Sequence, residues 1–440
     1  MNLNLHAPSF IALSLALLMP STLIAAEISV DSNTIVRIEQ RDVSGGSKED
    51  IIPATQFLGL DATKLADGNL SLHIAGWWRA DLGDRSYGDS DTAGNLTYGY
   101  LLYRLNKDAA DIRAGRFFVR EGIVNEQVDG VSAHASLPYG FAISAFGGAT
   151  VHTEDLIGEN SDGKGDTIFG GRFSYKYMKF LELGVSAVYE DSAPALDNYV
   201  NGNNRKVGGD IWLSPSRWIE LIGHSSYNTD TDKIAEHRYL LNLRPVANLT
   251  ISGQYSYQKE QSLFYSWAMA SGAALPSGDK TTITGVSATY TLTKSAEVSL
   301  DYNHYDREIG NADRYGGDLR LSFLENRLKS GISYHYLDAG PDFAISGTAS
   351  GTYQNLRAYV MHDTKSYFAS LEGIGYFFKE RINDEKNALQ ASFSLGYHLT
   401  PALALSGDIS YGENPEFKDE TKGLVRLTYN MTYDSIGGKK

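Results

Sequence analysis

The sequence predicts an all-β protein that folds as a closed antiparallel transmembrane β-barrel, and three observations support this fold class. Segments of about ten residues alternate apolar and polar side chains from Leu70 to Tyr433, and turn residues separate them. The connections between these segments alternate in length, and aromatic side chains gather at the segment ends. After the N-terminus, no stretch approaches the ~18 uninterrupted apolar residues of a membrane helix.

The composition agrees with this fold class and excludes several others. The 440 residues include 28 Tyr and 44 Gly, a combination typical of extended β structure. The chain has no Cys, so it carries no disulfide framework, zinc–thiolate site, Cys nucleophile or CxxCH haem attachment. A formal net charge of −14 argues against nucleic acid as a partner. We therefore expect no metal site and no cofactor on this chain.

Residues 1–26 predict a secretory signal peptide. Residues 10–19 form an apolar run of suitable length, and Ala25 and Ala26 offer a small-residue cleavage site before Glu27. Residues 1–9 contain no Lys or Arg, which departs from the usual pattern. The alternative is an N-terminal membrane anchor, but the run is short for that purpose and no stop-transfer charges follow.

The last predicted strand shows the alternation most clearly. Its apolar residues are Val425, Leu427, Tyr429, Met431 and Tyr433. They alternate with the polar residues Arg426, Thr428, Asn430 and Thr432. Because neighbouring side chains of a strand point to opposite faces, one face is apolar and the other polar. A helix would need a period of about 3.6 residues, which these segments do not supply. An open sheet edge cannot survive in hydrocarbon, so the sheet is expected to close.

The connections and the aromatic side chains predict the orientation of the barrel. Short connections fall near 106–108, 138–140, 214–216, 293–295, 324–326, 363–365 and 400–401. Long connections fall near 83–93, 152–166, 190–204, 258–280, 338–352, 379–386 and 412–420. Aromatic residues mark both ends of the strands on the apolar face, for example Tyr177, Tyr189, Tyr290, Tyr302, Tyr397 and Tyr411. This arrangement predicts short periplasmic turns, longer extracellular loops and two interfacial girdles.

The expected strand count is 20–22, with 18 as a fallback. About twenty strands lie between Leu70 and Tyr433, which we assign to the barrel as residues 70–433. Residues 27–69 are expected to form a further strand pair, and the alternative is a small plug or periplasmic arm. Residues 434–440 are expected to form a periplasmic C-terminal tail.

The polar face is expected to line a hydrated lumen. Both signs of charge occur there in about equal number, so we expect modest ion selectivity. The alternative is that cross-strand charge pairs only stiffen the wall. The apolar stretch within 258–280 is expected to narrow the mouth through Phe264, Tyr265 and Trp267, and the alternative is that it docks a partner. The pore-lining candidates are Arg79, Arg113, Arg172, Asp210, Arg238, Asp318, Arg320, Arg357, Glu372 and Asp408.

One phrase of the sequence resembles a known family. The stretch 113–119, followed by Glu121, Gly122 and the triplet 129–131, is similar to the "GR-aromatic … DG" strand-and-loop phrase of many Gram-negative porins. The whole pattern of signal peptide, alternating strands and terminal aromatic strand also resembles these porins. One departure is that seven residues follow Tyr433, whereas such barrels usually end on an aromatic residue. The barrel size and the cysteine-free exported chain also look like the barrel subunits of porin–cytochrome conduits.

These resemblances imply a Gram-negative outer-membrane location and three hypotheses for function. The leading hypothesis is a porin-like channel for passive diffusion of small hydrophilic solutes or ions, surrounded by outer-membrane lipid. The second is a scaffold that sheathes a partner in the lumen, such as a multihaem cytochrome or a lipoprotein. A remote third is an outer-membrane hydrolase, because scattered histidines could form a triad; they are His73, His134, His224, His304, His335, His362 and His398. No catalytic motif accompanies them, so we expect no enzyme.

Overall fold

The computed structural model describes residues 27–42, 48–83, 91–105, 109–151, 167–191, 203–258, 280–307, 310–340, 344–345, 348–415 and 419–434. The expected signal peptide, the loop candidates Phe264, Tyr265 and Trp267, and residues 435–440 lie outside these ranges. Within the described residues, no helix is long and apolar enough to cross a membrane.

The described chain is built almost entirely of strands. Their bounds are β1 (Glu27–Asp42), β2 (Lys48–Ile51), β3 (Pro53–Leu65), β4 (Leu70–Asp81), β5 (Thr92–Leu105), β6 (Ala110–Glu121), β7 (Val124–Ser136), β8 (Phe141–Thr150), β9 (Ile168–Tyr177), β10 (Leu181–Asp191), β11 (Asn203–Ser216), β12 (Ile219–Asn228), β13 (Lys233–Val246), β14 (Leu249–Gln258), β15 (Thr281–Thr293), β16 (Ala296–Arg307), β17 (Gly310–Phe323), β18 (Leu328–Ala339), β19 (Ala344–Ile345), β20 (Thr348–Ser350), β21 (Tyr353–Asp363), β22 (Tyr367–Ile382), β23 (Glu385–Thr400), β24 (Leu403–Glu413) and β25 (Glu420–Asp434). A single 3₁₀ turn, η1 (Pro138–Gly140), joins β7 to β8.

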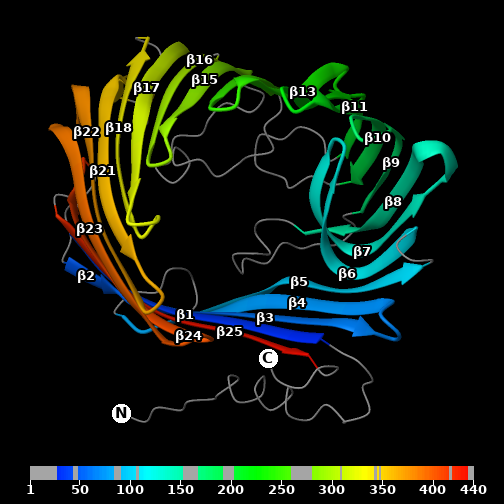
Figure 1. Cartoon of the computed structure of the whole chain (residues 1–440), viewed down its shortest axis with the longest axis horizontal. Coiled ribbons are helices and arrows are strands. Elements are labelled where there is room, and N and C mark those ends of the chain that lie inside the picture. The colour runs from blue at the N-terminus through cyan, green and yellow to red at the C-terminus, as the bar shows by residue number, and fades with distance from the viewer. Residues whose placement is uncertain are drawn as a thin grey trace.

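The strands close into a ring. One sheet holds 23 strands, of which β2 pairs only with the end of β1, so 22 strands form the wall. Successive strands pair antiparallel, and β1 closes the ring by pairing with β25, for example Val36 with Val425. Figure 1 looks through this ring, with β1 and β25 side by side. The predicted closed antiparallel barrel of 20–22 strands is confirmed.

The first two wall strands come from the N-terminal part of the described chain. β1 pairs with β3 from Glu27–Thr63 to Val36–Ala54. Residues 27–65 therefore supply part of the wall next to the closing strand β25. The short strands β19 and β20 pair only with each other, outside the main sheet.

The outer surface is apolar and the inner surface polar. Leu300 on β16 is 62% exposed and Val185 on β10 is 61% exposed, although both lie in the middle of their strands. The next residue along β16, Asp301, points to the other face and is engaged by Arg314. A row of exposed aliphatic side chains on a closed sheet is stable only in contact with lipid. The barrel thus spans a membrane, with its polar face around the lumen.

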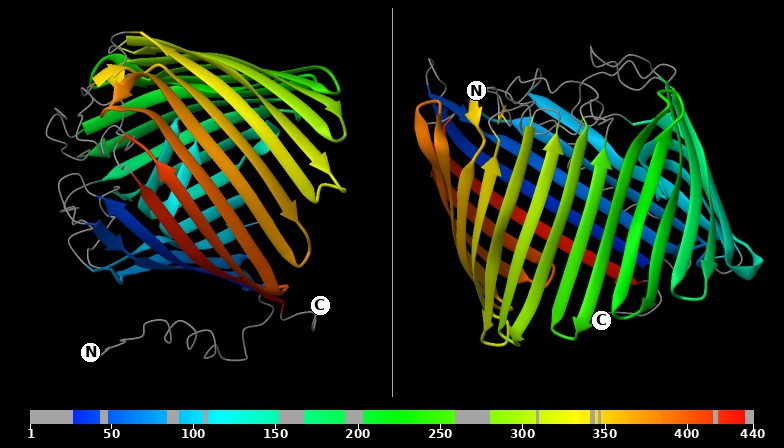
Figure 2. Two further views of the ribbon diagram at one scale, coloured as in Figure 1. Left: turned by 90° about the vertical axis from the view of Figure 1, so that its left-hand side faces the viewer. Right: turned by 90° about the horizontal axis from the view of Figure 1, so that it is seen from above.

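The two rims of the barrel differ (Figure 2). One rim carries only tight turns among the described connections, such as residues 66–69, 217–218 and 401–402, and Glu27 meets Asp434 at this rim. This is the periplasmic rim expected of such barrels. The opposite rim carries the longer connections, but it also has tight hairpins.

The stretch 379–386 corrects one expectation about this rim. It is mostly strand, since β22 runs to Ile382 and β23 begins at Glu385. Asn383 and Asp384 make the turn with φ of 47° and 68°. Asn and Asp tolerate this left-handed region, so a two-residue hairpin replaces the expected loop.

Candidate functional site

The β6–β7 hairpin leaves the barrel wall and enters the lumen. β6 pairs with β5 only up to Arg116, and β7 pairs with β8 only from Val128. Beyond these points the two strands continue to pair with each other, as far as Glu121 with Val124. We call residues 117–127 the inward hairpin. Figure 1 shows it standing inside the ring.

The tip of the inward hairpin touches the neighbouring part of the inner wall, two to four strands further along the ring. Gly122 occupies the turn with φ of +59°, a conformation that favours glycine. A Cβ atom there would lie 3.0 Å from Asp210 Oδ2 and 3.2 Å from Arg172 Cδ, and it would collide with Ser186 Oγ. These residues belong to β9, β10 and β11. The hairpin therefore lies against the inner wall from β8 to β11 and takes up part of the lumen.

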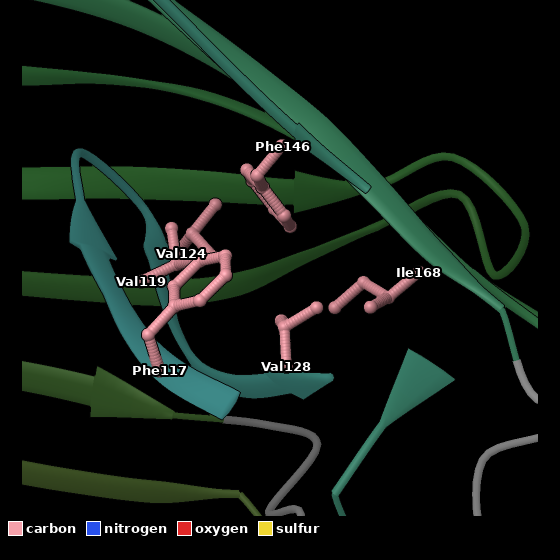
Figure 3. Close-up of a cluster of buried hydrophobic side chains, with 6 residues drawn as sticks. All are labelled: Phe117, Val119, Val124, Val128, Phe146 and Ile168. Carbon is pink, nitrogen blue, oxygen red and sulfur yellow. The ribbon is translucent and has the colours of Figure 1, made fainter. Parts of the chain in front are cut away.

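A small apolar cluster holds one face of the inward hairpin against the wall. Phe117 is 1% exposed and Val128 is fully buried, and both pack with Phe146 of β8 and Ile168 of β9. Figure 3 shows hairpin side chains on one side and Phe146 and Ile168 on the other. Burial of each such side chain stabilises by about 1.5–3 kcal/mol. In an otherwise hydrated lumen, this cluster gives the hairpin a fixed position.

Polar contacts hold the base of the inward hairpin. Arg116 forms a bidentate pair with Asp129, in which Nε and Nη2 each lie 2.7 Å from a carboxylate oxygen. Its Nη1 also donates to the backbone oxygen of Leu96 at 2.9 Å and to Asn95 Oδ1 at 3.0 Å. Planar fork geometry makes such a contact directional, so Arg116 fixes the angle at which the hairpin leaves the wall.

Two further bonds tie the arms of the inward hairpin to neighbouring strands. Gln127 Nε2 donates to the backbone oxygen of Thr97 on β5. Ser144 Oγ on β8 donates to Glu121 Oε2 near the hairpin tip. The hairpin is thus attached on both sides and at its end, so it is part of the folded barrel.

The other face of the inward hairpin points into the open lumen. Phe118 and Arg120 are exposed there, and the Arg120 guanidinium carbon lies 5.1 Å from the Phe118 ring centroid. Between the hairpin and β6–β8 lies a cavity of about 320 Å³, lined among others by Asp111, Arg113 and His134. A passing solute would meet a cation, an aromatic ring and carboxylates at this level.

Charge pairs line the rest of the lumen. Arg172 Nη2 lies 2.5 Å from Asp210 Oδ1 and 2.9 Å from Glu182 Oε1, directly beside the hairpin tip. Arg357 makes a bidentate pair with Glu372, at 2.8 and 3.2 Å. Further pairs join Arg320 to Glu297, Arg314 to Asp301 and Arg238 to Glu236. Opposite charges therefore neutralise each other locally along the wall.

All ten candidates proposed from the sequence lie on the face that alternates with the lipid-facing side chains. The structure brings Arg172 together with Asp210, and Arg357 together with Glu372. Arg79 lies 3.7 Å from Asp81, and Arg113 lies 3.9 Å from Asp111. Asp318 accepts a hydrogen bond from Ser333. Asp408 lies on β24, which five strands separate from β6.

Sequence reasoning missed the residues that build and line the inward hairpin, Phe118 and Arg120 above all. The signal was present in the phrase that resembles porins, because Arg116 and Asp129 of that phrase form the clamp at the hairpin base. The expected constriction residues Phe264, Tyr265 and Trp267 lie within 259–279, outside the described ranges.

One histidine has triad-like contacts. His73 Nδ1 lies 2.5 Å from Asp61 Oδ1, and its Nε2 lies 3.0 Å from Ser71 Oγ. Ser71, however, is only 2% exposed. Because a nucleophile must reach the substrate carbonyl, this buried hydroxyl is not placed for hydrolysis. We interpret the three residues as a hydrogen-bonded structural unit of the wall.

Exchanging Arg116 for Lys is expected to loosen the inward hairpin. Lysine keeps the charge but cannot make the bidentate contact with Asp129. Single-channel recordings of the variant should show excursions to larger conductance that the unaltered protein lacks. Arg120→Lys is the matched control, because Arg120 contacts Phe118 and does not clamp the base. Identical recordings for Arg116→Lys and the unaltered chain would contradict the role of the clamp.

No protein-family model matches the sequence, and no curated protein resembles it. Among solved structures, a variant of the ferric enterobactin receptor PfeA of Pseudomonas aeruginosa matches with 10% identity and a TM-score of 0.58, covering 91% of this chain and 80% of that chain. Acinetobacter baumannii OccAB4 matches with 8% identity and a TM-score of 0.48, covering 94% and 100%. The translocation pore of the P pilus usher PapC matches with 11% identity and a TM-score of 0.47, covering 92% and 99%.

At such low identities, the match with the receptor shows the fold alone. It is the fold of a large outer-membrane barrel, in agreement with the closed wall and its apolar outer surface. The chain is therefore a transmembrane β-barrel of the Gram-negative outer membrane.

Proposed function

We propose that this protein is an outer-membrane channel for the passive diffusion of small hydrophilic solutes or ions. The inward hairpin carries this proposal, because a folded constriction inside a polar lumen sets a size limit on passage. Apolar packing by Phe117 and the Arg116–Asp129 clamp hold the hairpin in place. Solutes would pass Phe118 and Arg120 on one side and paired wall charges on the other.

The mixed charges of the wall support weak selectivity between ions. Ion selectivity arises from an excess of one sign of charge along the path. Here Arg172 faces two carboxylates, and Arg357 faces one. The channel is therefore proposed to discriminate by size first and by charge second.

The scaffold hypothesis fits the structure less well. A sheathed cytochrome or lipoprotein would have to fit beside the inward hairpin or displace it. The hairpin is attached to the wall by an apolar cluster as well as by polar bonds, so vacating the lumen would expose Phe117 and Val128. The buried position of Ser71 also speaks against a hydrolase.

Reconstitution of the purified full chain into planar bilayers tests the proposal. Discrete conductance steps are expected, and liposomes carrying the protein should swell in small sugars but not in large polysaccharides. Silent bilayers and impermeable liposomes, from protein that is correctly folded by far-UV circular dichroism, would overturn the proposal. Gentle extraction that yields a stoichiometric haem protein would favour the scaffold.

Arg172→Gln is expected to shift the selectivity of the channel toward cations. The substitution leaves Asp210 and Glu182 without their shared counter-ion beside the hairpin tip. The reversal potential in a salt gradient measures the shift. Arg217→Gln is the control, because Arg217 stacks on Trp218 in a periplasmic turn. An unchanged reversal potential for Arg172→Gln would show that the permeation path avoids this part of the wall.

A further inference from the structure

Three metal-ligating side chains meet on the inner wall at β16, β17 and β18. They are Asp301, Asp318 and His335, and one possible ligand atom of each lies within 4.8 Å of the others. His335 Nε2 lies 2.8 Å from Asp301 Oδ1, and the His335 side chain is 9% exposed. The imidazole is thus nearly buried and directed at a carboxylate.

A glycine makes this meeting possible. Asp301 and His335 sit on different strands, and Gly316 of β17 is the cross-strand partner of both. A Cβ atom at Gly316 would collide with His335 Cδ2. Because Gly316 has no side chain, Asp301 and His335 contact each other across the intervening strand. The three ligands therefore share one small space on the wall.

Neighbouring side chains hold both carboxylates in orientation. Asp301 Oδ2 accepts from Arg314 Nη1 at 3.2 Å and from Asn303 Nδ2 at 3.4 Å. Asp318 Oδ1 accepts from Ser333 Oγ at 2.5 Å. Asp318 therefore keeps Oδ2 for a ligand, whereas a metal ion would take the place of the hydrogen between Asp301 Oδ1 and His335 Nε2. Such outer partners orient metal ligands in known sites and tune their affinity.

We infer that Asp301, Asp318 and His335 bind a divalent transition-metal ion of the Zn²⁺ class. One imidazole and two carboxylates leave a fourth position for water, which suits the tetrahedral preference of zinc. Hard cations such as Ca²⁺ and Mg²⁺ take six or more oxygen ligands, mostly carboxylates, carbonyls and water, and gain little from an imidazole. Arg314 contacts Asp301, and Arg357 lies near Asp318 but is itself paired with Glu372, so the surroundings keep a net negative charge that a divalent cation neutralises.

The site faces the inward hairpin across the ring, because β17 lies half-way around the wall from β6. A bound cation would add positive charge to the wall opposite Arg120. In the proposed channel, micromolar Zn²⁺ is therefore expected to reduce the current of cations. This consequence rests on the proposed function, whereas metal binding itself does not.

Metal titration of the tag-free full chain in detergent tests the inference. Calorimetry should detect one Zn²⁺ site, and Co²⁺ should give the intense visible absorption of four-coordinate geometry. His335→Gln should abolish both signals, and Ser333→Ala should weaken zinc binding by about 10–100-fold. His224→Gln is the matched control, since His224 also lies on the lumen wall and pairs with Glu236 at 3.2 Å.

Equal zinc binding by His335→Gln and the unaltered protein would overturn the inference, as would equally strong binding of Mg²⁺. If His335→Gln fails to fold by far-UV circular dichroism, Asp318→Asn serves as the second variant. Calorimetry does not depend on conductance. Silent bilayers with intact zinc binding would therefore reject the channel and retain the metal site.

Discussion

Replacing Phe118–Gln127 with the two-residue turn Asn-Gly is expected to raise the single-channel conductance severalfold. Phe117 and Val128 are cross-strand partners, so a type I′ turn can join them without disturbing the wall below. The replacement removes the part of the chain that projects into the lumen, including Gly122 at the tip. Larger solutes should enter liposomes that carry the shortened protein, and the measurement is conductance together with the size limit in swelling assays.

The matched control shortens another tight hairpin of the same rim. The turn at residues 229–232 joins β12 to β13, and its polar groups bond to the rim through Tyr227, Arg205 and Asn228. Replacing residues 229–232 with Asn-Gly should leave conductance and size limit unchanged. If the inward-hairpin variant also keeps the conductance of the unaltered protein, another part of the chain sets the size limit.

The wall of this barrel could be predicted because side-chain alternation has a local cause. Each strand sends consecutive side chains to opposite faces, so Val425 and Arg426 reveal which face meets lipid. Closure follows from the cost of unpaired backbone groups in hydrocarbon. The aromatic side chains follow the same alternation. Tyr177, Tyr290 and Tyr397 are exposed at one end of the wall, and Tyr302 and Tyr411 are exposed at the other.

The inward hairpin could not be predicted from the same alternation. Residues 117–121 alternate like any wall strand, with Phe117 and Val119 on one face and Phe118 and Arg120 on the other. Their contacts with β5, β8 and β9 keep them inside the lumen, and these contacts form only when the barrel folds. Alternation gives the face of a side chain but does not tell whether that face meets lipid or another part of the inner wall.

The zinc-binding cluster was missed for a related reason. Asp318 was expected to line the pore and His335 was named only among the scattered histidines, and the spacing of Asp301, Asp318 and His335 follows no metal-binding motif. Their meeting depends on the register that places Gly316 between Asp301 and His335. The turns and bulges of the folded sheet set the register across three strands. The register therefore cannot be predicted from the sequence of one strand alone.

Leu300→Arg is expected to destabilise the folded barrel by about 2–4 kcal/mol, which is the cost of a lipid-facing Arg near the bilayer midplane. Leu300 lies in the middle of β16 and is 62% exposed on the outer surface. Denaturant unfolding of the full chain from lipid vesicles measures the loss.

The adjacent variant Ser299→Arg adds the same charge to the same strand on the opposite face. Ser299 lies on the lumen side and shares a hydrogen bond of 3.0 Å with Thr289, so its replacement should cost only about 0.5–1.5 kcal/mol. The two substitutions differ by one position along β16, so strand propensity and distance from the rim are nearly matched. The difference in unfolding free energy therefore reports which face is in contact with lipid. A larger loss for Ser299→Arg than for Leu300→Arg would reverse the assignment of the two faces, and with it the hydrated lumen on which permeation and metal access both depend.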